Sequence, residues 1–130
     1  MTVILTIQAL VFADGGILAL GANITNMGII GALVGYSLFD YMRKILQKEK
    51  GLVIGSFLGG FTGVVLAAIA AAIEIGISGT VDIGAAILAM GLWHILIGIG
   101  EGTITAGVLM YLKTIEFDLD TFSNWKPVGV

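Results

Sequence analysis

Long apolar runs, interrupted at only a few polar positions, make up most of the first 115 residues of this chain. The clearest run covers residues 51–75 and contains one ionisable side chain, that of Glu74. A helix of about 20 apolar residues can cross the roughly 30 Å hydrocarbon core of a bilayer. This run is therefore predicted to be a transmembrane helix.

Four apolar segments can be placed along the chain, at residues 2–20, 26–46, 51–75 and 82–115. The first is continuously apolar only to about residue 13, which is too short to cross a bilayer unless its helix continues through Gly15 and Gly16. The last would measure about 50 Å as one straight helix. We therefore expect it to tilt, kink or break near Gly98, Gly100 and Gly102.

The composition fits a membrane protein, because 58% of the residues are hydrophobic, 12% are charged and the mean hydropathy is +1.07. We predict an all-α fold, a polytopic membrane helical bundle over residues 1–115 with about four transmembrane segments, followed by a polar tail at 116–130. Cysteine is absent from the sequence. This excludes a disulfide scaffold and a thiolate metal site.

Polar residues interrupt the apolar pattern between Ala13 and Gly31, where the sequence reads ADGGILALGANITNMGIIG. Non-helical backbone at membrane depth is stable only when it is buried in protein or lines a polar cavity. We expect a break in the helix here, where the chain contacts a polar group or cavity. The cluster from Asn23 to Asn26 is expected to cap the start of the second segment.

The basic residues indicate an orientation. Four of them lie at the end of the second segment and in the connection to the third, at Arg43, Lys44, Lys48 and Lys50. Short loops rich in Lys and Arg face the cytoplasm, so the 43–50 loop and the C-terminus are predicted to be cytoplasmic, and the polar interruption external. The expected location is the cell membrane, with the lipid bilayer around the helices. Because the cations are concentrated in one loop and the net charge is −3, no nucleic-acid partner is expected.

The sequence contains no pattern typical of an enzyme. A GxxxxGK[ST] phosphate-binding loop is absent, which excludes ATP hydrolysis by that route. The sequence GIGEG at residues 98–102 lies within an apolar helix rather than between a strand and a helix, so it is not a dinucleotide-binding motif.

His94 and Glu101 lie seven positions apart in the last segment, so their side chains share one helical face. An imidazole and a carboxylate can both bind a divalent transition metal, but two ligands do not complete a site. The alternative is a buried, hydrogen-bonded His–Glu pair that joins two helices. Both interpretations stay open on the sequence.

Small residues recur every four positions in the third segment, at Gly55, Gly59 and Gly63. Such a ridge lets another helix approach closely. It can serve as an interface with a partner subunit or as ordinary packing within this polypeptide.

Two blocks of sequence resemble the substrate-capture subunits of cobalt and nickel energy-coupling-factor transporters, the CbiM/NikM family. They are QALVFADGGILALGANITNMGIIG at residues 8–31 and HILIGIGEGTITAGVLMYL at residues 94–112. The resemblance implies the C-terminal part of a seven-helix bundle that captures Co²⁺ or Ni²⁺ as its substrate and holds no permanent cofactor. The implied partners are a transmembrane coupling subunit, an ATPase and the N-terminal half of the bundle.

Members of this family open with Met-His and carry a second His in an S-H-P-T-G-type loop, and this chain has neither. No residue here therefore inherits the role of a metal ligand, although His94 stays a candidate. The residues expected to support the pocket without binding the metal are Asp14, Gly15, Gly16, Asn23, Asn26 and Glu101. Two explanations stay open. The chain is a fragment whose other half supplies the ligands, or it is a ligand-less paralogue or small membrane scaffold with an assembly role.

Overall fold

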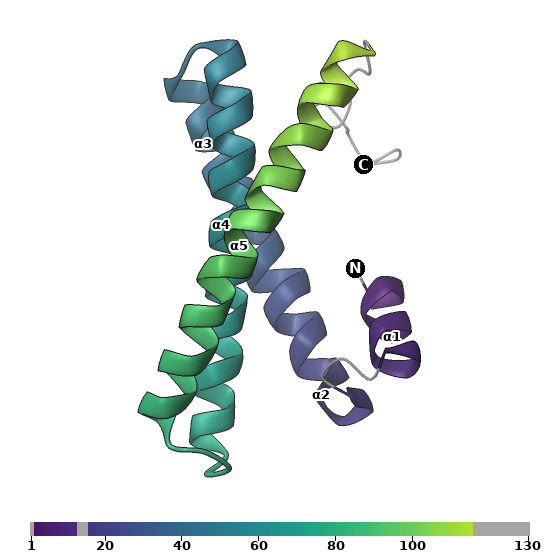
Figure 1. Ribbon diagram of the computed structural model, residues 1–130, viewed down its shortest axis with the longest axis vertical. Helices are drawn as coiled ribbons and strands as arrows, with labels where there is room; N and C mark the ends of the chain where they lie inside the picture. Colours follow the sequence, from purple (N-terminus) through teal and green to yellow (C-terminus); the bar gives the residue numbers. More distant parts are fainter. Residues whose placement is uncertain (1, 13–15, 116–130) are drawn as a thin grey trace, which may run out of the picture.

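The computed structural model describes residues 2–12 and 16–115, and every regular element in that part of the chain is a helix (Figure 1). The elements in chain order are α1 (Thr2–Val11), α2 (Gly16–Asn23), the π-helix η1 (Ile24–Gly31), α3 (Ala32–Ile45), α4 (Lys48–Ile77) and α5 (Ile83–Thr114). The predicted all-α fold is confirmed.

Three of the described helices are long and apolar enough to cross a membrane, at Gly16–Ile45, Glu49–Ile77 and Ile83–Thr114. The first of these joins α2, η1 and α3 into one helix of 30 residues. The helix α1 is apolar but has only ten residues. A polytopic membrane bundle is therefore confirmed, with three long helices and one short one in place of four full segments.

Residues 16–31 of the polar stretch are helical, whereas the sequence pattern predicts a break there. The first predicted segment, 2–20, is divided, because α1 ends at Val11 and the next helix begins at Gly16. Gly16 has a φ of +68°, a conformation that glycine adopts without strain. The expectation that a helix starts at Asn26 is wrong, since Asn23 and Asn26 lie inside a continuous helix and Asn23 makes no side-chain capping bond.

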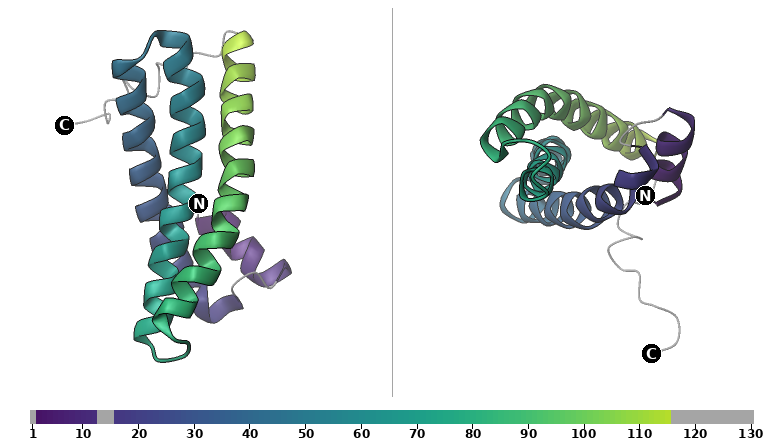
Figure 2. Two further views of the ribbon diagram at one scale, coloured as in Figure 1. Left: turned by 60° about the vertical axis from the view of Figure 1, so that its left-hand side comes forward. Right: turned by 90° about the horizontal axis from the view of Figure 1, so that it is seen from below.

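The central helix of the bundle is α4, which packs against α3 on one side and α5 on the other (Figure 2). The turn between α3 and α4 lies at one end of the bundle, and the turn between α4 and α5 lies at the other (Figure 1). Asp82 begins α5 as its N-cap, because its Oδ1 accepts a hydrogen bond from the Ala85 backbone N–H at 3.0 Å. The short α1 packs beside α2 and η1.

Glycines allow α3 and α4 to approach closely. A Cβ atom added to Gly59 would lie 2.7 Å from the carbonyl oxygen of Gly35, and one added to Gly63 would lie 2.8 Å from that of Gly31. A Cβ atom added to Gly55 would lie 3.0 Å from the carbonyl oxygen of Phe39. The ridge of Gly55, Gly59 and Gly63 is thus occupied by η1 and α3 of the same chain.

A second set of glycines packs α5 against α4. A Cβ atom on Gly102 would lie 2.6 Å from the carbonyl oxygen of Phe57, and one on Gly98 would lie 3.0 Å from the Phe61 ring. Of the expected tilt, kink or break near these glycines, the break is excluded, because α5 is one continuous helix from Ile83 to Thr114. Gly98 and Gly102 instead provide the close contact between helices that small residues permit.

Candidate functional site

The π-helix η1 turns Asn26 towards α4. In a π-helix the backbone bonds join residues five apart, so Asn26 and Gly31 lie about one turn from each other on the same side. Both contact α4, Asn26 through Glu74 and Gly31 through Gly63. In an α-helix, residues five apart would point in clearly different directions. The π-helix therefore lets the polar contact and the glycine contact form together.

Asn26 is the most buried polar side chain of the described residues, with 1% of its surface exposed. Its Nδ2 donates a hydrogen bond to Glu74 Oε2 at 2.9 Å. Its Oδ1 is also buried and accepts no hydrogen bond from the described part of the chain. Leaving a buried polar atom without a partner costs about 1–3 kcal/mol, so this oxygen has an unused capacity to bind.

A cavity of about 90 Å³ lies between α2–η1, α4 and α5 next to Asn26. Four small or apolar side chains of α4 form one wall, and five residues from the other helices form the rest. The lining residues are Asn23, Asn26, Met27, Val64, Ala67, Ala68, Ala71, Met90 and His94. The cavity lies beside the C-terminal half of α4, towards the turn that leads to α5.

The ring of His94 is held by its own helix. Its Nδ1 lies 2.7 Å from the carbonyl oxygen of Met90. Because a carbonyl only accepts hydrogen bonds, Nδ1 carries the proton, and in the neutral ring Nε2 keeps a free lone pair. A backbone carbonyl that accepts from one ring nitrogen is one of the partners by which proteins orient a metal-binding imidazole.

The structure brings together only some of the residues that the sequence singles out. Asn23, Asn26 and His94 line one cavity. Glu101 does not join them, because it is exposed on α5 and its side chain makes no hydrogen bond or ion pair within the described residues. The alternative of a buried His94–Glu101 pair is thus not realised there. Asp14 and Gly15 lie outside the described residues, and Gly16 begins α2.

Sequence reasoning missed Glu74, Met27 and Met90. A signal existed for Glu74, because it is the one ionisable residue of the run from 51 to 75, and an ionisable side chain in a transmembrane helix normally has a polar partner. The two methionines had no such signal, since a methionine in an apolar helix is ordinary core.

The cavity offers an imidazole nitrogen, amide oxygens and thioether sulfurs. Imidazole suits nickel, cobalt and zinc, and thioether suits softer metals. Within residues 2–12 and 16–115, no three His, Asp or Glu side chains come close enough to hold a metal ion. Among the described residues, the imidazole of His94 is therefore not joined by two such carboxylate side chains.

Comparison with known proteins also indicates a membrane protein of cobalt or nickel transport. Residues 1–119 match the family model described as the cobalt uptake substrate-specific transmembrane region, CbiM. A protein of Archaeoglobus fulgidus named as a putative fused nickel transport protein, NikMN, is 46% identical over 92% of this chain and 39% of its own length. A protein of Methanocaldococcus jannaschii named as a putative metal transport protein is 36% identical over 100% of this chain and 60% of its own length.

The cobalt transport protein CbiM of Sorangium cellulosum is 34% identical over 92% of this chain and 56% of its own length. This chain thus spans about 40 to 60% of the lengths of these curated relatives. No solved structure gives a significant match. Because the family model covers nearly all of the chain and agrees with its long apolar helices, the chain belongs to the CbiM family of cobalt uptake transmembrane proteins.

Proposed function

We propose that this chain is a membrane component of an energy-coupling-factor transporter that takes up Co²⁺ or Ni²⁺. The observation that carries the proposal is the family match over residues 1–119. The helical bundle supplies the membrane-embedded part, and the sequence contains no phosphate-binding loop. The proposal therefore assigns ATP hydrolysis to a separate ATPase, which acts through a transmembrane coupling subunit.

The direct ligands of the captured metal are proposed to come from outside these 130 residues. Support comes from the sequence, which has a single histidine and so offers one imidazole for the metal. The residues around η1 then shape and support the capture pocket. Asn23, Asn26 and the neighbouring Asp14, Gly15 and Gly16 are the proposed supporting positions.

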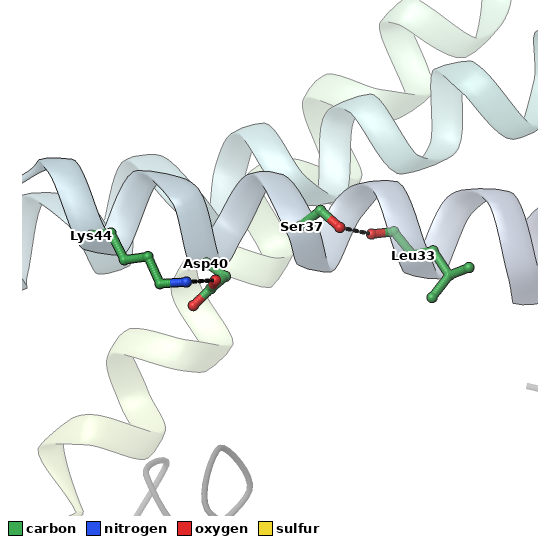
Figure 3. A network of polar contacts seen from close by, with 4 residues as sticks. All are labelled: Leu33, Ser37, Asp40 and Lys44. Carbon is green, nitrogen blue, oxygen red and sulfur yellow. Dashed lines mark hydrogen bonds and ion pairs between the residues drawn. The ribbon is translucent and has the colours of Figure 1, made fainter.

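The turn between α3 and α4 is proposed to face the cytoplasm. Basic side chains gather at this end of the bundle, and short basic loops favour the cytoplasmic side. Figure 3 shows the ion pair of Lys44 with Asp40 on α3, one turn beyond Ser37, whose hydroxyl donates to the Leu33 carbonyl. At the same end, Lys113 of α5 donates to Glu49 of α4 at 2.9 Å.

Metal accumulation in cells tests the proposed function. A bacterial strain that lacks its own nickel and cobalt uptake systems is given the coupling subunit, the ATPase, the N-terminal part of a family member and this chain. We expect cellular nickel or cobalt to rise only when all four are present, as measured by inductively coupled plasma mass spectrometry. An ATPase variant without hydrolysis is the control for passive entry.

Other outcomes separate the alternatives. Accumulation that does not depend on the N-terminal part would overturn the proposal that the ligands come from outside this chain. A complex that assembles with the coupling subunit but never raises cellular metal would indicate the assembly role of a ligand-less paralogue.

A further inference from the structure

We infer that the cavity between η1, α4 and α5 is a binding site for a divalent transition-metal cation, held by Asn26 Oδ1 and His94 Nε2. This inference deepens the proposed function, and it rests on that function for the identity of the cation. The site is proposed in addition to the metal ligands assigned above to residues outside these 130.

Asn26 presents an unused oxygen to the cavity. Its side chain is 1% exposed, its Nδ2 is fixed by Glu74 at 2.9 Å, and its Oδ1 has no donor among the described residues. The bond to Glu74 determines which end of the amide is free, because only the NH₂ group can donate to a carboxylate. The free end is an oxygen, which can bind a cation.

His94 has one ring nitrogen available as a ligand. The Met90 carbonyl accepts a hydrogen bond from Nδ1 at 2.7 Å, so the remaining ring nitrogen is a lone-pair donor. His94 and Asn26 come from different helices and line the same cavity of about 90 Å³. A single water needs about 10–15 Å³ of such space, so a cation can enter together with water that completes its coordination.

The residues of this site favour weak binding of a cation. Two protein ligands and water bind a cation weakly. The neighbouring thioethers of Met27 and Met90 add little to the affinity, because thioether sulfur is a weak ligand for Ni²⁺ and Co²⁺. A site on a transport route must release its ion as well as bind it. The composition of the cavity therefore fits a cation in passage rather than one that is stored.

The chain offers a direct spectroscopic test, because His94 is its only histidine and it has no cysteine. The full chain, purified without a histidine tag, is placed in lipid nanodiscs with isotope-labelled histidine. Co²⁺ is then added while the ring signals of His94 are followed by NMR. We expect saturable paramagnetic shifts of these signals, whereas Mg²⁺ at the same concentration leaves them unchanged. Ring signals that keep their diamagnetic positions throughout the Co²⁺ titration would overturn the inference.

Two variants test the second ligand. Asn26→Leu removes the amide oxygen and is expected to weaken Co²⁺ binding at His94 by about tenfold or more. Thr103→Val, at an exposed polar position on α5 that does not line the cavity, is the matched control and should bind as the unmodified chain does. Equal affinities in the folded Asn26→Leu variant and the control would show that Asn26 is not a ligand. If Asn26→Leu does not fold, the role of Asn26 is tested in the unmodified chain with labelled asparagine side chains. Co²⁺-induced shifts of the Asn26 signals would support it as a ligand, and unchanged signals would exclude it.

The test is independent of the proposed function. If the transporter accumulates metal but the ring signals of His94 do not respond to Co²⁺, the proposed function stands and the inference of this site is wrong. If the chain binds Co²⁺ at His94 but supports no accumulation of metal in cells, the site stands and the proposed function is wrong.

Discussion

Asn26 and Glu74 connect η1 to α4 by a single hydrogen bond between side chains 48 positions apart. In a membrane, an amide group that loses its partner cannot turn to water. This bond therefore fixes the position of η1 on the central helix, and with it the cavity wall that η1 provides.

Replacing Glu74 tests the importance of this bond. Glu74→Leu leaves the Nδ2 of Asn26 without an acceptor, so we expect it to lower the free energy of unfolding by about 1–3 kcal/mol. Glu74→Gln keeps an oxygen acceptor and should remain close to the unmodified chain. Thermal unfolding in detergent, followed by circular dichroism, measures both. Equal unfolding temperatures for the two variants would contradict the role given to the bond.

The glycine seam between α3 and α4 leads to a second prediction at the residue scale. Gly59→Ala introduces a Cβ atom 2.7 Å from the Gly35 carbonyl oxygen, so the helices must separate. We expect a loss of about 1–3 kcal/mol, the usual cost of overpacking. Gly100→Ala is the matched control, because a Cβ atom there meets nothing within 4 Å beyond its chain neighbours and the adjacent backbone of its own helix. The same thermal measurement compares the two, and an equally stable Gly59→Ala variant would mean that the seam tolerates separation.

At the scale of elements, η1 decides how α3 meets α4. Its eight residues keep Asn26 and the glycines Gly31 and Gly35 on the side of α4. Removing one residue restores an α-helical path and rotates the helix on the N-terminal side of η1 by about 100° relative to α3. Asn26 and the glycine seam then cannot both reach α4.

Deletion of Ile29 is the test of this element. The side chain of Ile29 is 53% exposed, so Ile29→Ala removes little packing and is the matched control. We expect the deletion to lower the unfolding temperature far more than the substitution does. Comparable unfolding temperatures for the two variants would show that the register set by η1 is unimportant.

The long helices can be predicted from the sequence, whereas η1 cannot. The apolar run of residues 51–75 lies within α4, because length and apolarity alone determine a transmembrane helix. Asn23 and Asn26 were expected to cap a helix, since both are of a residue type that favours that position in water. The contact of Asn26 with Glu74 instead keeps the backbone helical, and a contact between segments so distant in sequence leaves no local pattern.

Some residues of the candidate site could be predicted from the sequence, but their grouping in space could not. His94 and the two asparagines were identifiable as polar residues in apolar surroundings, and they line one cavity. Their grouping depends on how α5 crosses α4, which the glycines Gly98 and Gly102 set through packing rather than through periodicity. For the same reason Glu101, on the His94 face by sequence spacing alone, lies exposed instead.

For the whole molecule, the outer surface is strongly apolar. Large hydrophobic side chains are exposed on α2 and α5, including Leu18 and Trp93. In water such surfaces would associate, whereas in a membrane they face lipid or other transmembrane helices. Glu101 is a charged exception within α5, and charged residues at membrane depth usually face protein or water.

The orientation of the bundle can be measured with single cysteines, because the chain contains none. Gln47→Cys lies in the turn between α3 and α4, and Thr80→Cys lies in the turn between α4 and α5, where both residues are exposed. We expect a membrane-impermeant maleimide to label Thr80→Cys in intact cells and to label Gln47→Cys only after lysis. The opposite pattern would reverse the orientation inferred from the basic residues.

Transport by purified components tests the central claim most directly. Proteoliposomes contain the coupling subunit, the ATPase and the N-terminal part of a family member, with or without this chain, and uptake of radioactive nickel or cobalt is measured on addition of ATP. The proposed function predicts ATP-dependent accumulation only in vesicles that contain the chain. Equal accumulation with and without the chain would contradict it.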